Sequence, residues 1–184
     1  MARLTAVSVE ASLETMGNYK ALFDDTRSRL QNGDAKNPVV VSVSSQWTGE
    51  FRSKISIREF EICIDQPKGF GGSDTGPKPS EMLLAALAAC QEVTYRLYAD
   101  ALSIPLNEVR VELTGLQDLQ GFLGVDNNIA AGFQEVRGSV FLDSTASDTE
   151  LERLRQTVEQ HCPVLDDFRR PVDVEIEMRR GSKT

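Results

Sequence analysis

The stretch of sequence that decides the fold reads GGSDTGPKPSEMLLAALAAC and runs from Gly71 to Cys90. Its first half is rich in glycine and proline and predicts a loop, and Pro79 suits the first turn of a helix. That helix is expected over residues 79–101, and its first part is apolar on every side. Such a helix must be buried all round, so the rest of the fold, or a second subunit, has to enclose it.

The residues before this stretch predict one helix and several strands. Apolar side chains recur at helical spacing over residues 12–30, where Asn32-Gly33-Asp34 provides a stop. Residues 39–47 and 51–64 alternate as strands do, with a slip in phase before Phe60 that indicates a second turn or a bulge. Residues 66–80 are expected to form one long loop, and loops of this length are often functional.

The residues after it predict further strands around a capped helix. Alternation over residues 109–113 and 133–142 indicates two strands with a long connection. Ser147 and Glu150 have the spacing of a capping box, which opens a helix that ends at Cys162-Pro163. A last strand is expected over residues 172–178. The plan is α+β without repeats, with residues 1–37 as an N-terminal helical extension and residues 38–184 as one domain.

Composition excludes several classes of function. The 184 residues carry a formal net charge of −8, which disfavours binding to nucleic acid. The longest strongly apolar run, residues 82–90, is far shorter than the roughly 20 residues that span a bilayer. The first residues lack the apolar stretch of a secretory signal. We therefore expect a cytoplasmic protein without nucleic-acid or membrane partners.

The few cysteines and the one histidine limit the chemistry further. Three cysteines, none spaced as C-x-x-C, and one histidine make a metal site hard to assemble, and we expect no metal and no cofactor. No G-x-S-x-G motif is present for a serine hydrolase. His161 is more typical of a helix C-terminus than of a catalytic base. Cys63 is expected to be a packing residue.

Cys90 is the residue with the most chemical interest. By composition alone it is most simply a core cysteine, because it lies too deep in its helix for the helix dipole to act on it and apolar burial raises the pKa of a thiol. A reactive Cys90 would need a cation from another element. Arg52 and Arg58, on the preceding strands, are the candidates.

Three segments resemble one known family. Residues 71–90 resemble the signature of the OsmC/Ohr superfamily of osmotically inducible and organic-hydroperoxide-resistance proteins. Residues 115–132, with Gly121-Phe122-Leu123-Gly124, resemble an OsmC-like subgroup, and residues 159–164 (EQHCPV) resemble the family's second cysteine segment. The resemblance covers residues 39–178. It implies an intertwined homodimer in which curved antiparallel sheets wrap around long central helices, with active sites at the subunit interface.

The resemblance also implies an activity, a thiol-dependent peroxidase that reduces organic hydroperoxides in oxidative and osmotic stress defence. Cys90 matches the peroxidatic cysteine and Cys162 the resolving cysteine, and an external dithiol, such as a lipoyl-bearing protein, would reduce the resulting disulfide. An arginine activates the thiol in this family, and Arg52 is preferred here to Arg58 and Lys54. Ser80 occupies the position of the family's orienting glutamate, and Glu81 follows one residue later. Trp47 and Phe70 are candidates for lining an apolar pocket, or for core or interface positions.

Two alternatives remain open at this point. The first is a non-catalytic stress-response or apolar-ligand-binding dimer in which Cys90 only lines the pocket. The second is an enzyme whose specificity or reductant differs because Ser80 reshapes the site.

Overall fold

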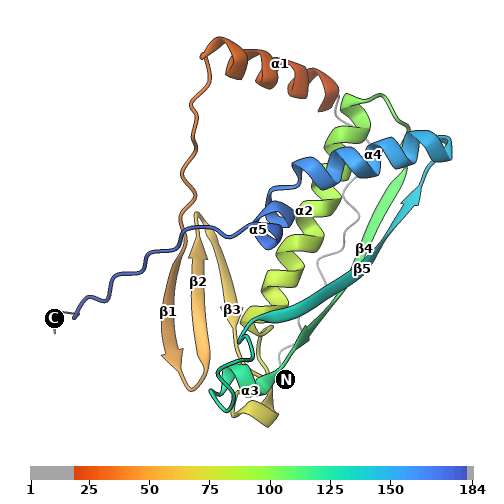
Figure 1. Ribbon diagram of the computed structural model, residues 1–184. Coiled ribbons are helices and arrows are strands. Elements are labelled where there is room, and N and C mark those ends of the chain that lie inside the picture. Colours follow the sequence, from red (N-terminus) through yellow and green to blue (C-terminus); the bar gives the residue numbers. More distant parts are fainter. Residues whose placement is uncertain (1–18, 182–184) are drawn as a thin grey trace, which may run out of the picture.

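The computed structural model describes residues 19–181 and shows a mixed α+β fold (Figure 1). None of the described helices is long and apolar enough to cross a membrane. In chain order the elements are α1 (Tyr19–Asn32), β1 (Ser44–Gly49), β2 (Arg52–Ile57), β3 (Phe60–Ile64), the short 3₁₀ helix η1 (Lys68–Phe70), α2 (Pro79–Ala101), β4 (Glu108–Gln117), α3 (Leu119–Phe122), β5 (Phe133–Asp143), α4 (Asp148–His161) and α5 (Pro163–Arg169).

Several local predictions are confirmed by these elements. Helix α2 has the predicted bounds, with Pro79 in its first turn. Helix α4 opens with the predicted capping box, in which the Glu150 N–H donates to Ser147 Oγ at 3.3 Å and the Ser147 N–H donates to the Glu150 carboxylate at 2.9 Å. The phase slip before Phe60 is a turn between β2 and β3, where Arg58 has a φ of 53°.

Other predictions need correction. The predicted strand over residues 39–47 begins only at Ser44, and residues 12–18 of the predicted first helix lie outside the described residues. Residues 172–178 form no strand, because no strand among residues 19–181 pairs with them. Their apolar side chains stay exposed, from 59% at Val172 to 93% at Met178. The alternation correctly marks a segment with one apolar face, but no described residue covers that face.

The described strands form two antiparallel sheets. One has three strands in the order β1-β2-β3, and the other pairs β4 with β5. Helix α2 packs against the β4–β5 sheet, against α4 and α5, and near its C-terminal end against α1 (Figure 1). The core lies at these contacts and includes Ala99, Leu154, Val158 and Cys162, each with no exposed surface.

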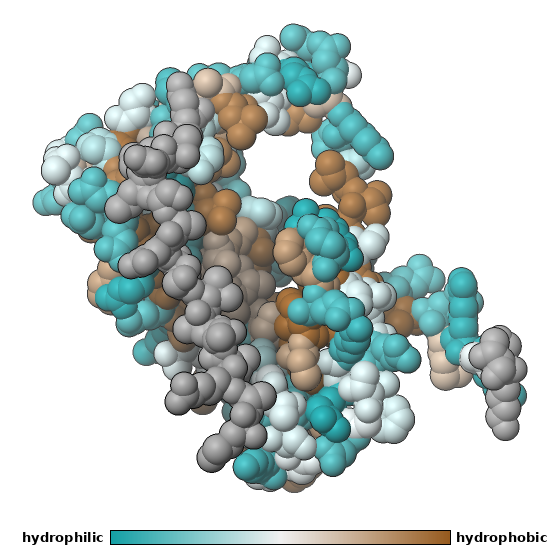
Figure 2. Space-filling view, turned by 180° about the vertical axis from the view of Figure 1, so that it is seen from behind, coloured by the Kyte–Doolittle hydropathy of each residue, from teal (hydrophilic) through white to brown (hydrophobic). Residues whose placement is uncertain are grey.

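One face of α2 is not covered by the described residues, so the predicted enclosure of this helix by the rest of its own fold is incomplete, and enclosure by a second subunit stays a prediction. Leu83 is 47% exposed and Val93 is 67% exposed. The three-stranded sheet makes no extensive contact with any described helix. Figure 2 accordingly shows hydrophobic residues, in brown, at the surface over the middle of the molecule. The described residues of one chain therefore enclose only part of α2.

Candidate functional site

The fold brings Cys90 and Cys162 together from distant parts of the sequence. Cys90 lies in the middle of α2, and Cys162 lies at the junction between α4 and α5. Their Sγ atoms are 3.4 Å apart, and both thiols are free. Because a disulfide bond is about 2.05 Å long, only a small further approach of the two sulfurs is needed to form one.

The surroundings of Cys90 favour its protonated form. Burial raises the pKa of the thiol, and the adjacent Cys162 raises it further, whereas the Val164 N–H and the Thr94 hydroxyl lower it, with a net upward shift. Thr94 also donates a 2.6 Å hydrogen bond to the Cys90 carbonyl, which fixes this turn of the helix. The described residues of one chain therefore favour the thiol of Cys90 over its thiolate.

The two thiols differ in their access to solvent. Cys162 is fully buried, whereas Cys90 is partly exposed. Cys90 lies on the same helical face as Leu83, Ala86 and Val93, since residues three, four and seven positions apart stack along an α-helix. This is the uncovered face of α2. A small molecule or a second chain can therefore reach Cys90 but not Cys162.

The cations predicted to activate Cys90 lie on the three-stranded sheet. Arg52 is on β2, with Nη2 3.8 Å from the Glu50 carboxylate, and its buried Nε has no hydrogen-bond partner among the described residues. Arg58 lies in the β2–β3 turn with its guanidinium 5.1 Å from the Phe60 ring centre. Because this sheet does not pack on α2, the single chain brings neither arginine to Cys90.

The competing cation Lys54 is already paired, since its Nζ lies 2.5 Å from the Glu61 carboxylate. Glu50 was missed by sequence reasoning. It lies in the β1–β2 turn and also accepts a 2.7 Å hydrogen bond from the Ser73 hydroxyl, so it connects Arg52 to the loop after β3.

Ser80 and Glu81 lie in the first turn of α2. The Glu81 carboxylate accepts a 3.0 Å hydrogen bond from the Lys78 N–H, as a helix-capping side chain does. Ser80 is the second residue of the helix and is not its N-cap, which is Lys78. The helix rises by about 15 Å from Ser80 to Cys90, at 1.5 Å per residue. Neither side chain acts on the Cys90 thiol within this chain.

The remaining predicted residues lie apart from the thiol pair. Trp47 is 71% exposed and donates a 2.8 Å hydrogen bond to the Glu50 carbonyl, and Phe70 is 46% exposed on η1. Cys63 is exposed on β3, so the prediction that it packs is wrong for this chain. His161 is the last residue of α4, as expected of a helix terminus, and its ring stacks on Tyr98 at 5.2 Å.

Asp65 organises the loop that precedes α2, a role that sequence reasoning missed. It is fully buried at the end of β3 and accepts hydrogen bonds from the backbone N–H groups of Gln66, Ser73 and Thr75 and from the Thr75 hydroxyl, at 2.8–3.2 Å. Burial raises the pKa of the carboxyl, but the Thr75 bonds and the other donors outweigh it and lower the pKa to about 2. An aspartate directly before a glycine- and proline-rich loop was the available signal.

Two glycines let the loop before α2 pass close to β3 and to Gln66, which follows that strand. A Cβ on Gly72 would lie 1.9 Å from the Gln66 carbonyl oxygen, and one on Gly76 would lie 2.3 Å from that of Cys63. No side chain fits at either position. The loop is thus held tightly, and it fixes where α2 begins.

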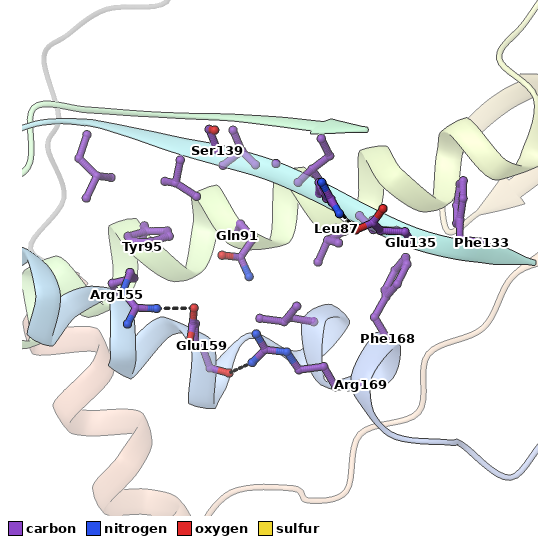
Figure 3. A pocket seen from close by; sticks show the side chains of 18 of the residues that line it. Leu87, Gln91, Tyr95, Phe133, Glu135, Ser139, Arg155, Glu159, Phe168 and Arg169 are labelled. Carbon is purple, nitrogen blue, oxygen red and sulfur yellow. Dashed lines mark hydrogen bonds and ion pairs between the residues drawn. The ribbon is translucent and has the colours of Figure 1, made fainter. Parts of the chain in front are cut away.

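A cavity of about 800 Å³ lies between α2, β5, α4 and α5 (Figure 3). Gln91 points into it from α2, is only 8% exposed, and its Nε2 has no partner among the described residues. Arg155 is held by Glu159 at 2.5 Å on the opposite wall. Neither Cys90 nor Cys162 lines this cavity. It is therefore adjacent to the thiol pair but does not contain it.

Known structures share this fold. An OsmC-like protein from Mycoplasma pneumoniae is 23% identical with a TM-score of 0.63, over 71% of this chain and 88% of that chain. An organic hydroperoxide resistance protein OsmC from Legionella pneumophila is 20% identical with a TM-score of 0.54, over 76% and 96%. An OsmC-like protein of unknown function from Vibrio cholerae is 12% identical with a TM-score of 0.58, over 71% and 94%.

Sequence comparison identifies the family. No curated protein matches the chain. The family model described as OsmC-like protein matches residues 71–177, which is more than half of the chain and includes both Cys90 and Cys162. This protein therefore belongs to the OsmC-like protein family.

Proposed function

We propose that this protein is a thiol-dependent peroxidase that reduces organic hydroperoxides to alcohols in stress defence. The observation that carries the proposal is the 3.4 Å separation of the Cys90 and Cys162 sulfurs, of which Cys90 is partly exposed and Cys162 is buried. Membership of the OsmC-like family supports it, as does the name of the Legionella pneumophila protein, an organic hydroperoxide resistance protein.

The bond-making steps of the proposed reaction use the two thiols, once Cys90 is ionised. The Cys90 thiolate attacks the distal oxygen of the hydroperoxide, the O–O bond breaks, and the alkoxide leaves and is protonated to the alcohol, so that Cys90 becomes a sulfenic acid. The Cys162 thiolate then attacks the Cys90 sulfur, hydroxide leaves and is protonated to water, and a disulfide forms. An external dithiol, such as a lipoyl-bearing protein, returns both thiols by exchange and becomes a disulfide itself.

We further propose that the active form is a homodimer in which the partner completes the site. Two surfaces support this proposal. The face of α2 around Cys90 is exposed, and the three-stranded sheet packs on no described helix, so a partner subunit could bury both. In this arrangement two α2 helices form the centre, and the sheet of one chain delivers Arg52, or alternatively Arg58, to Cys90 of the other. A guanidinium there stabilises the thiolate and donates hydrogen bonds to the peroxide.

In this proposal Glu50 orients the arginine, because its carboxylate lies 3.8 Å from Arg52 Nη2. Ser80 belongs to the first turn of α2 and takes no part in the reaction. A cytoplasmic location fits a cycle that depends on reduced thiols. Trp47, exposed on β1 and paired with Ser53 of β2, would then border the apolar entry for the organic group of the substrate.

A second candidate is a non-catalytic OsmC-like dimer that binds an apolar ligand. The upward shift of the Cys90 pKa favours it, because a protonated thiol is a poor nucleophile. In this case Cys90 would be a lining residue.

Steady-state consumption of cumene hydroperoxide with dihydrolipoamide as reductant distinguishes the two candidates. The peroxidase predicts turnover that is lost in Cys90→Ser and retained in the matched control Cys63→Ser, which removes an exposed thiol from β3. Equal, background rates in the wild-type protein and Cys90→Ser would reject the peroxidase and leave the binding protein.

A further inference from the structure

A second cavity, of about 610 Å³, lies where α1 meets α2 and α4. Leu22, Phe23 and Leu30 of α1 face Leu97 and Tyr98 of α2 across it, and His161 of α4 closes one side. The space is an open groove at the surface, and apolar side chains that gather at such a groove often mark a binding site. Leu22 is 60% exposed and Leu30 45% exposed, although both line the cavity. Its volume lies in the range of small-molecule sites, about 300–1,000 Å³.

The walls of this cavity are held by specific contacts. The Phe23 ring meets Tyr98 edge to face at 5.4 Å, and Tyr98 stacks on His161 at 5.2 Å. The Lys20 ammonium donates a 3.0 Å hydrogen bond to the Ala101 carbonyl at the end of α2. Helix α1 is therefore fixed on α2 at several points while the space between them stays open.

One cation at this cavity has no acidic partner. The acidic residues of α1 pair elsewhere, Asp24 with Lys20 at 3.4 Å and Asp25 with Arg29 at 3.9 Å. Arg27 lines the cavity and forms no ion pair with any described residue. Tyr98 lines the same cavity, and the pKa of its phenol is raised by burial and lowered by the Arg27 charge. The cavity is thus lined by apolar side chains together with one guanidinium, that of Arg27, and one phenol, that of Tyr98.

We propose that this cavity is a binding site for an anionic amphiphile, a monocarboxylate with an unbranched hydrocarbon chain. The carboxylate pairs with Arg27 and accepts a hydrogen bond from the Tyr98 hydroxyl, and the chain lies between α1 and α2. A charge-assisted hydrogen bond contributes specificity for the anion, and burial of the chain contributes affinity. The site does not depend on the peroxidase proposal, because neither Cys90 nor Cys162 lines the cavity.

The test titrates the full-length protein with sodium dodecanoate, kept below its micelle concentration, by isothermal titration calorimetry and by NMR of methyl-labelled leucine. We expect saturable binding of one dodecanoate per chain, with shifts at Leu22, Leu30 and Leu97. Arg27→Gln should weaken binding about tenfold, the effect expected of one lost charge-assisted hydrogen bond. The matched control Arg29→Gln removes the same charge from the same helix at a residue that does not line the cavity, and should stay within about twofold of wild type.

The outcomes separate the proposal from simple hydrophobic or charge effects. Dodecyltrimethylammonium, which has the same chain and the opposite charge, should bind much more weakly than dodecanoate. The proposal is overturned if the two amphiphiles bind equally, if Arg27→Gln binds as wild type does, or if the shifts fall on methyl groups outside the cavity. It is also overturned if dodecanoate does not bind and intermolecular NOEs show a second copy of the chain against Leu22 and Leu97.

Discussion

The backbone N–H of Val164, in the first turn of α5, donates a hydrogen bond to the sulfur of Cys90. Cys162 lies two residues earlier and contacts the same sulfur. The short segment at the α4–α5 junction therefore supplies both the second thiol and a donor to the first. This donor only partly offsets the effect of burial, so the Cys90 pKa remains above its ordinary value in one chain.

The first prediction concerns the cation that activates Cys90. If the partner's Arg52 approaches the sulfur, it stabilises the thiolate and lowers the pKa, and Arg52→Gln removes that effect. The rate of Cys90 alkylation by iodoacetamide, followed by mass spectrometry from pH 6 to 10, should then have a midpoint below about 8.5 in wild type and above it in Arg52→Gln. At pH 7 the variant should react about tenfold more slowly for each unit of difference.

The matched control for this prediction is Arg58→Gln, which removes the same charge from the β2–β3 turn. Its midpoint should equal that of wild type. A shift in Arg58→Gln with none in Arg52→Gln would transfer the role to Arg58. Identical curves for all three proteins would contradict activation by either arginine.

The second prediction concerns Asp65 and acid stability. Its folded-state pKa is about 2, below the ordinary 3.8, so the carboxylate stabilises the fold above about pH 4 and this contribution is lost as the pH falls from about 4 to about 2. Asp65→Asn should therefore lower the urea midpoint at pH 7, and the difference from wild type should shrink towards pH 2.5. A difference that is constant across this range would show that the charge of Asp65 does not stabilise the loop.

The third prediction concerns the close passage of the loop over β3. Gly76→Ala places a Cβ 2.3 Å from the Cys63 carbonyl oxygen, so part of the loop must move, and the free energy of unfolding should fall by roughly 2–3 kcal/mol. Gly69→Ala is the control, because nothing lies within 4 Å of its Cβ position. That variant should be unchanged or more stable by up to about 1 kcal/mol. Equal urea midpoints for both variants would refute the tight fit.

The fourth prediction concerns the exposed face of α2 as a subunit interface. Val93→Glu places a charge beside Cys90 on that face, and we expect the dimer to dissociate at least tenfold more readily in sedimentation analysis. Val125→Glu is a control of similar exposure, 71% against 67%, that follows α3. It should leave the association unchanged. A monomeric wild-type protein at micromolar concentration would contradict the homodimer.

The sequence is informative where structure is local. The bounds of α2, the capping box at Ser147 and the turn before Phe60 were all predictable, because each depends on residues within a few positions. The pairing of Cys90 with Cys162 was suggested by family resemblance and not by spacing, since these residues are joined only through the tertiary packing of α2, α4 and α5.

The sequence is less informative where a structural feature depends on residues that are far apart in the chain or on the conformation of a loop. The alternating segment from Val172 to Met178 resembled a strand but pairs with no described strand, and Cys63 was predicted to pack but is exposed. The Asp65 network was missed because three of its four donors are backbone N–H groups, whose positions depend on the loop conformation and not on residue type.

The most direct test of the account is the product of one stoichiometric oxidation. Reduced protein is treated with one equivalent of tert-butyl hydroperoxide, and the thiols are identified by peptide mass spectrometry under non-reducing conditions. We predict a Cys90–Cys162 disulfide with Cys63 still free, and in Cys162→Ser a sulfenic acid on Cys90 that dimedone traps. Unmodified Cys90 after treatment, or oxidation confined to the exposed Cys63, would contradict the proposed peroxidase.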